Sequence, residues 1–142
     1  MADGDSPLEC LSLPPAIVTK SILLVEDDAP SRELYRSALQ GGGHNVITAE
    51  DGLAALHCIG EALPQVIVLD MMLPRLGGRD VLRELRANPE TRYIPVIIIT
   101  GTDVSNLSER AGIPVLQKPF ALSVLVAAVD AAILRARLQR PT

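Results

Sequence analysis

The sequence contains no tryptophan, two tyrosines and one phenylalanine in 142 residues. Basic side chains are also in the minority, with 13 against 17 acidic ones and a net charge of −4. Proteins that bind single-stranded nucleic acid use basic grooves lined by aromatic rings on which the bases stack. The composition therefore argues against nucleic acid as a direct partner.

Long hydrophobic runs are absent as well. A helix needs roughly 20 consecutive apolar residues to cross a membrane, and prolines interrupt the more hydrophobic half of this chain well before that length. The first residues have neither the cationic leader nor the apolar stretch of an export signal. We therefore expect a cytoplasmic protein without a membrane partner.

The apolar content of 48% is enough for one domain with a complete core. Residues 1–19 carry three prolines and three acids without a sustained period of 2 or 3.6, so we expect a disordered tail there. Residues 20–142 then form one domain of ordinary size.

Short apolar runs alternate with longer segments of helical period along this domain. Continuous apolar strands are typical of a sheet buried on both faces, and the alternation predicts βαβ units with a parallel sheet between two layers of helices. The inward faces of the first two helices are expected to carry Leu34 and Leu53 among their apolar residues. The pattern predicts strands at 21–25, 46–49, 66–69, 96–99 and 114–117, and helices at 31–40, 52–61, 78–87, 104–111 and 121–138.

Four of the five expected strands run directly into a charged or hydroxyl side chain. Glu26 and Asp27 follow the first strand, and Asp70 follows the third. Thr100 follows the fourth, and Lys118 follows the fifth. Ligands of open parallel sheets bind outside the carboxyl ends of the strands, so we expect these side chains to meet in one site.

Three carboxylates at one edge repel one another unless a cation lies between them, and their hard oxygen atoms suit Mg²⁺ or Mn²⁺. With a divalent metal beside Glu26 and Asp27, the Asp70 carboxylate can act as a nucleophile toward a phosphoryl group. The metal, Lys118 and the Thr100 hydroxyl would then share the charge on the transferring oxygens. This pattern predicts phosphoryl transfer to an aspartate.

Four motifs at the expected strand ends resemble the signatures of the receiver domains of two-component response regulators. They are Leu-Val-Glu-Asp-Asp at 24–28, Val-Leu-Asp-Met-Met-Leu-Pro at 68–74, Ile-Ile-Thr-Gly at 98–101 and Gln-Lys-Pro-Phe at 117–120. The resemblance covers about residues 21–138 and implies a single flavodoxin-like (βα)5 domain with strand order 2-1-3-4-5.

The resemblance also assigns roles to individual residues. It implies that Asp70 is the phosphoacceptor, and that Thr100 and Lys118 contact the phosphoryl group. It further implies a cis peptide bond between Lys118 and Pro119. The metal ligands implied in this way are Asp27, Asp70 and the main-chain carbonyl of Met72, with Glu26 beside the metal.

The chain departs from the family pattern in three places. Val115 stands where the family usually has the aromatic residue that moves on phosphorylation, and the expected helix at 104–111 is short. The segment 121–134 has one charged residue, Asp130, so this last helix is apolar nearly all round. Such a helix is usually covered, and we expect a homodimer or partner interface there.

The resemblance implies a stand-alone receiver that takes a phosphoryl group from a histidine kinase or phosphotransfer protein. It would signal by binding a downstream protein or by relaying the group, and would not be an enzyme in the usual sense. One alternative is a receiver-like interaction module that works without phosphorylation. Another is an aspartate-nucleophile phosphatase, which typically has a second acid two residues after the nucleophile, where this chain has Met72.

Overall fold

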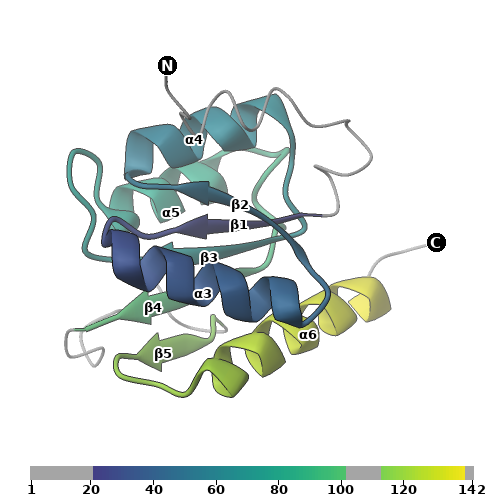
Figure 1. The fold of residues 1–142 in the computed structure, drawn as a ribbon. Coiled ribbons are helices and arrows are strands. Elements are labelled where there is room, and N and C mark those ends of the chain that lie inside the picture. The colour runs from purple at the N-terminus through teal and green to yellow at the C-terminus, as the bar shows by residue number, and fades with distance from the viewer. Residues whose placement is uncertain (1–20, 102–112, 140–142) are drawn as a thin grey trace.

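The computed structural model describes residues 21–101 and 113–139, which form a five-stranded parallel sheet with the order β2-β1-β3-β4-β5 (Figure 1). The predicted strand order is confirmed. The expected tail at 1–19 and the expected helix at 104–111 lie outside the described residues. The elements are β1 (Ser21–Val25), α3 (Ala29–Gly41), β2 (Asn45–Ala49), α4 (Gly52–Glu61), β3 (Val66–Asp70), α5 (Gly78–Ala87), β4 (Val96–Thr100), β5 (Val115–Gln117) and α6 (Leu122–Gln139).

Helices cover both faces of the sheet, α4 and α5 on one side and α3 and α6 on the other (Figure 1). Neighbouring strand residues point to opposite faces. In β1, Leu23 and Val25 pack with α4 and α5, whereas Ile22 and Leu24 pack with α3 and α6. The central strands are buried throughout, as their continuous apolar runs predicted.

Two predicted inward residues are in fact exposed. Leu34 on α3 is 52% exposed and Leu53 on α4 is 54% exposed, so this prediction was wrong. The first turn of α4 packs Gly52 against the loop after β3, where an added Cβ would lie 2.1 Å from the carbonyl oxygen of Leu76. This contact fixes the rotation of α4 and turns Ala55 and Ile59 inward instead of Leu53, because these positions follow Gly52 by three and seven residues.

The buried side of α3 is set by an aromatic contact. Tyr35 is buried at 8% exposure, and its ring stacks on Phe120 with the ring centroids 5.4 Å apart. Leu39 follows one turn later on the same face. This stripe packs beside α6 and leaves Leu34 on the solvent side.

Within the described residues, no helix combines the length and the apolar composition that crossing a membrane would require.

Candidate functional site

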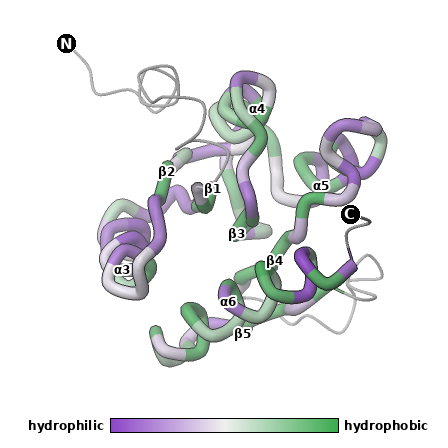
Figure 2. Tube along the Cα trace, turned by 90° about the vertical axis from the view of Figure 1, so that its right-hand side faces the viewer, coloured by the Kyte–Doolittle hydropathy of each residue, from purple (hydrophilic) through white to green (hydrophobic). Residues whose placement is uncertain are grey.

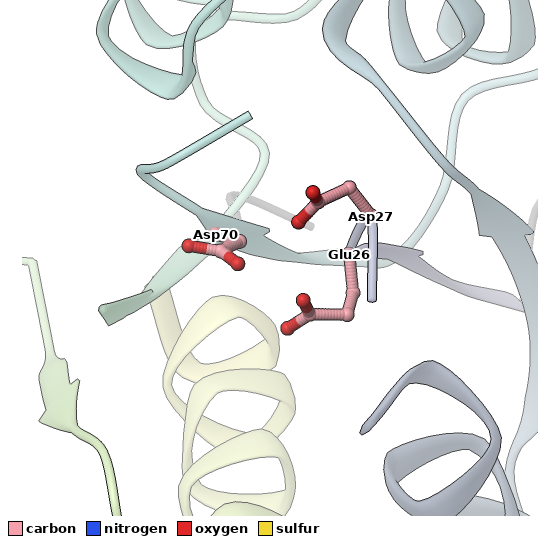
Figure 3. A group of neighbouring side chains, drawn as sticks. All are labelled: Glu26, Asp27 and Asp70. Atoms are coloured by element: carbon pink, nitrogen blue, oxygen red, sulfur yellow. The ribbon is translucent and has the colours of Figure 1, made fainter. Parts of the chain in front are cut away.

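Three carboxylates meet at the carboxyl edge of the sheet, as the sequence predicted. Glu26 and Asp27 follow β1 and Asp70 ends β3, and Figure 3 shows their side chains directed toward a common space. One carboxylate oxygen from each residue lies within 4.8 Å of the others. Glu26 and Asp70 are buried at 1% and 2% exposure, whereas Asp27 is exposed. The group is thus sheltered on one side and open to solvent on the other.

Lys118 brings a positive charge to these carboxylates from the end of the edge strand β5. Its Nζ lies 3.0 Å from Glu26 Oε1 and 3.2 Å from Asp70 Oδ2. The lysine follows β5, and the peptide bond between Lys118 and Pro119 is cis, as the resemblance implied. Burial alone would lower the pKa of Lys118, but the hydrogen bond to Glu26 and the charge of Asp70 outweigh burial and raise it. The side chain therefore stays cationic.

The ionised form of Glu26 is disfavoured in this arrangement. Burial raises its pKa above the ordinary value, and the nearby charge of Asp70 adds to the rise. The hydrogen bonds from Lys118 and from the backbone N–H of Asp28 offset only part of the effect. Lys118 thus compensates the buried Glu26 carboxylate only in part, and a further cation nearby would stabilise the ionised form of Glu26.

The two Asp70 oxygens have different partners. Oδ1 accepts a hydrogen bond of 3.0 Å from the backbone N–H of Met72, while Oδ2 faces Lys118. The carboxylate is therefore held in one orientation at the end of β3. The Met72 side chain is 61% exposed and points its apolar surface to solvent.

Thr100 occupies the end of β4, next to both Asp70 and Lys118 in the sheet. It is fully buried, and its carbonyl oxygen accepts a 2.7 Å hydrogen bond from the backbone N–H of Lys118. The strand register pairs Asp70 with Ile99 and Thr100 with Gln117. The backbone thus places Asp70, Thr100 and Lys118 on three adjacent strand ends.

Asp28 has a structural role and lies outside the group formed by Glu26, Asp27 and Asp70. Its Oδ2 accepts a 3.0 Å hydrogen bond from the backbone N–H of Ser31 and caps the start of α3. Hydrogen bonds from the side chain and backbone of Ser31 lower the pKa of Asp28. This cap begins α3 two residues earlier than the predicted start at residue 31.

Sequence reasoning missed two side chains that support the site. Arg32 donates from Nη1 to the carbonyl oxygen of Glu26 at 2.9 Å, so the first turn of α3 fixes the backbone of the acidic segment. The Tyr35 ring lies beneath Lys118, with Nζ 6.0 Å from the ring centroid, a favourable cation–π distance. Neither contact has a signal in the linear pattern, because both depend on how α3 packs on the sheet.

The donor set fits a hard divalent cation. Glu26, Asp27 and Asp70 offer only oxygen atoms, and the exposed side at Asp27 leaves access for water, which Mg²⁺ keeps in its coordination shell. The same edge holds the ammonium group of Lys118 beside the oriented carboxylate of Asp70. Such a combination is suited to accepting a negatively charged phosphoryl group.

Comparison with known proteins defines the class. Residues 22–130 match the family model described as the response regulator receiver domain. The chain belongs to this family, which confirms the resemblance found in the sequence. It is a receiver domain of the two-component type, and the geometry of the acidic group is consistent with the phosphoacceptor role of such domains.

Particular relatives support this assignment. The chain is 40% identical over 124 residues to the response regulator MprA of Mycobacterium ulcerans (strain Agy99), covering 83% of this chain and 52% of that protein. It is 39% identical over 122 residues to MprA of Mycobacterium avium (strain 104), covering 82% and 52%. The chain therefore spans about half the length of the curated relatives it matches.

Solved structures show the same architecture. The signal receiver domain of a putative LuxO repressor protein from Vibrio parahaemolyticus has 30% identity and a TM-score of 0.77, covering 84% of this chain and 94% of that one. A response regulator receiver domain protein from Clostridium thermocellum has 29% identity and a TM-score of 0.76, covering 85% and 99%. These likenesses agree with the flavodoxin-like strand order described above.

Proposed function

We propose that this receiver domain accepts a phosphoryl group on the Asp70 carboxylate from a histidine kinase or phosphotransfer protein. The phosphorylated domain would then signal by binding a downstream protein or by passing the group on. The observation that carries the proposal is the position of Asp70, buried at the end of β3 with Lys118 3.2 Å from one oxygen and two further carboxylates beside it.

Glu26, Asp27 and Asp70, with the main-chain carbonyl of Met72, are the residues that would hold Mg²⁺ or Mn²⁺. When bound, the metal supplies positive charge to the phosphoryl oxygens and to the carboxylates. The support for this assignment is the all-oxygen donor set and the raised pKa of Glu26, which burial imposes first. A bound cation would lower the free-energy cost of keeping Glu26 ionised.

In the proposed transfer step, side chains of this domain supply the nucleophile and hold the phosphoryl group. One Asp70 oxygen forms the new O–P bond while the bond between phosphorus and the donor's nitrogen or oxygen breaks, and the electron pair of that bond leaves with the donor. Lys118 and the Thr100 hydroxyl would hold the phosphoryl oxygens. The backbone N–H of Met72 keeps the carboxylate oriented at 3.0 Å. The product stays attached to the chain, so we propose a signalling state and no enzyme in the usual sense.

One observation favours a second candidate, a receiver-like module that binds its partner without phosphorylation. Val115 lies half-buried in β5 and packs against the core cluster under α4 and α5. An aliphatic side chain in that place lacks the ring that the family moves on phosphorylation. The presence of Glu26, Asp27, Asp70 and Lys118 together supports the first candidate, the phosphorylated receiver.

Incubation with acetyl phosphate and Mg²⁺ tests the proposal. We expect the intact mass to increase by one phosphoryl group, in a linkage that survives acid and is lost in base, as an acyl phosphate is. Asp70→Asn should abolish the modification. Asp80→Asn, which changes an exposed aspartate of α5, is the matched control and should be modified like the unchanged chain.

An unmodified wild-type chain would favour the binding module. Repeated hydrolysis of phosphate esters would favour the phosphatase. Modification that persists in Asp70→Asn would exclude Asp70 as the acceptor.

A further inference from the structure

Helix α6 carries an apolar stripe that stays exposed among residues 21–101 and 113–139. Three of its larger members are Val124, Leu134 and Leu138, which are 45%, 57% and 76% exposed. Ala127 and Ala131 are exposed between them. In Figure 2 the tube is green along much of α6, which marks hydrophobic residues on a helix at the molecular surface. We call Val124, Ala127, Ala131, Leu134 and Leu138 together the α6 stripe.

The α6 stripe lies on the side of the helix opposite the core. Leu125, Val129 and Ala132 are buried and pack on the sheet. With about 100° of rotation per residue, the centre of the stripe lies about 145° around the helix from the centre of this buried face. Among the described residues, the stripe therefore faces away from the sheet, on the solvent side of α6.

The residues of the α6 stripe are spaced as in the contact line of a coiled coil. Its positions follow one another at intervals of three, four, three and four residues. This alternation is the a/d repeat of a coiled-coil seam, which is narrower than the apolar face of an ordinary surface helix. The stripe extends over about 21 Å of helix, since each residue adds about 1.5 Å. Two small alanines at its centre allow two helix backbones to approach closely.

Charges of opposite sign flank the seam. If Val124 is assigned to an a position, Asp130 falls at g and Arg135 at the following e. In a parallel pair of helices in register, a g residue faces the e residue five positions later on the other helix. The Asp130 carboxylate is 57% exposed and is fixed on its flank by a 2.8 Å contact from Oδ1 to His44 Nε2, while Arg135 is exposed on the opposite flank.

We propose that two copies of this chain associate through α6 in a parallel, in-register pair. The α6 stripe forms the seam, and Asp130 of each copy faces Arg135 of the other. The occupant is a second copy because the seam and its flanking charges are complementary to themselves under a two-fold rotation. One helix pair is a small interface, so the dimer dissociates at micromolar concentration. The proposal is independent of phosphorylation at Asp70.

Sedimentation of the full unphosphorylated chain from about 5 to about 500 µM tests the association. We expect a monomer–dimer equilibrium. Leu134→Glu should weaken it by about 100-fold or more, because each dimer loses two buried leucines. Leu53→Glu is the matched control, since Leu53 is 54% exposed on α4 and lies far from the stripe along the chain. Thermal melts by circular dichroism check that both variants stay folded.

Charge reversal tests the flanking contacts. Asp130→Arg alone and Arg135→Asp alone should each weaken the dimer, because each places like charges across the seam. The double variant Asp130→Arg with Arg135→Asp should recover most of the lost affinity. A role of Asp130 confined to its contact with His44 predicts no recovery, because the double variant still lacks that contact.

Cysteine cross-linking tests the orientation. Leu138→Cys should form a disulfide-linked dimer under mild oxidation at a rate well above both the unchanged chain and Gln139→Cys, whose side chain lies off the seam. A monomer at every concentration, or a dimer that Leu134→Glu leaves intact, would overturn the proposal. Cross-links that form only when Val124→Cys and Leu138→Cys chains are mixed would overturn the parallel orientation.

Discussion

The Arg75 guanidinium lies 3.0 Å from the carboxylate of Asp51 and thereby ties the loop after β3 to the first turn of α4. The Asp51 side chain is 8% exposed, and its Oδ1 also accepts a 2.8 Å hydrogen bond from the backbone N–H of Ala54. One buried carboxylate thus caps α4 and anchors the loop that follows Asp70. Arg75 has a positive φ of 65°, which only a few per cent of residues other than glycine adopt.

Loss of Asp51 should destabilise the domain more than loss of Arg75. Asp51→Ala removes both the helix cap and the ion pair, and we expect a decrease of about 1–2 kcal/mol in the free energy of unfolding. Arg75→Ala leaves the cap in place and should cost less than about 1 kcal/mol, because the guanidinium is largely exposed. Urea denaturation measures both changes. Arg83→Ala, which breaks an exposed pair with Asp80 on α5, is the control and should stay within about 0.5 kcal/mol of wild type. Equal effects of all three variants would contradict a special role for the buried carboxylate.

Gly78 should not tolerate a side chain. An added Cβ would lie 2.6 Å from the carbonyl oxygen of Asp70 and 2.6 Å from the Cα of Met71, and these backbone atoms cannot move without displacing Asp70. We expect Gly78→Ala to lower the free energy of unfolding by about 1–3 kcal/mol and to slow phosphorylation by acetyl phosphate.

Gly60→Ala provides the opposite case. Gly60 lies within α4 with no atom inside 4 Å of an added Cβ, so alanine there should raise the free energy of unfolding by about 0.5–1 kcal/mol. Thermal or urea unfolding distinguishes the two substitutions. A stabilising Gly78→Ala would show that the loop after β3 is looser than its contacts indicate.

The Tyr35 phenol should titrate above pH 10. Burial raises its pKa, and the charges of Glu26 and Asp70 add to the rise although Lys118 opposes it. The unfolded phenol has a pKa near 10, so between that value and the folded pKa the folded state binds more protons. The contribution of Tyr35 to stability is therefore lost as the pH rises through this window.

The variant Tyr93→Phe leaves Tyr35 as the only tyrosine, so its absorbance near 295 nm reports this group directly. A midpoint at or below 10 in the folded protein would contradict the burial of the phenol in solution. Unfolding in urea at the same pH values provides the comparison, because the midpoint should fall to about 10 once the ring is exposed.

Mg²⁺ should stabilise the folded domain. A ligand that binds only the folded state adds RT ln(1 + [L]/Kd), or about 2.7 kcal/mol at 100 times the dissociation constant. We expect Mg²⁺ to raise the melting temperature of the wild type, and NaCl of equal ionic strength to leave it nearly unchanged. Asp27→Asn should remove most of the Mg²⁺ effect, because it replaces the exposed carboxylate of the group. Asp80→Asn should retain the effect. A Mg²⁺-induced shift of equal size in Asp27→Asn would place the metal elsewhere.

The convergence of the site was predictable from the sequence because it depends on backbone topology. Once Val25 and Leu69 are identified as the last residues of apolar runs in parallel strands, Glu26 and Asp70 must emerge at the same edge of the sheet. The sequence could not show which oxygen of Asp70 faces Lys118. That depends on side-chain packing across 48 residues of sequence.

The rotation of the helices was not predictable to the same degree. Leu34 and Leu53 fit the helical period, yet they face solvent, because Tyr35 stacks on Phe120 and Gly52 packs on the backbone of Leu76. A period identifies a stripe of apolar residues with an uncertainty of about one position, or about 100° of rotation. Tertiary contacts select the position that is buried.

The sequence by itself determined the parallel sheet, the edge at which the acids and the lysine meet, and the excess of apolar residues on the last helix. These follow from strand periodicity, chain connectivity and composition, which are local properties. The tertiary structure alone decided that Arg75 anchors to Asp51, that Tyr35 underlies Lys118, and that the excess on α6 is a single seam opposite the core. These relationships join residues that are distant in the chain, and only the packing of helices on the sheet brings them into contact.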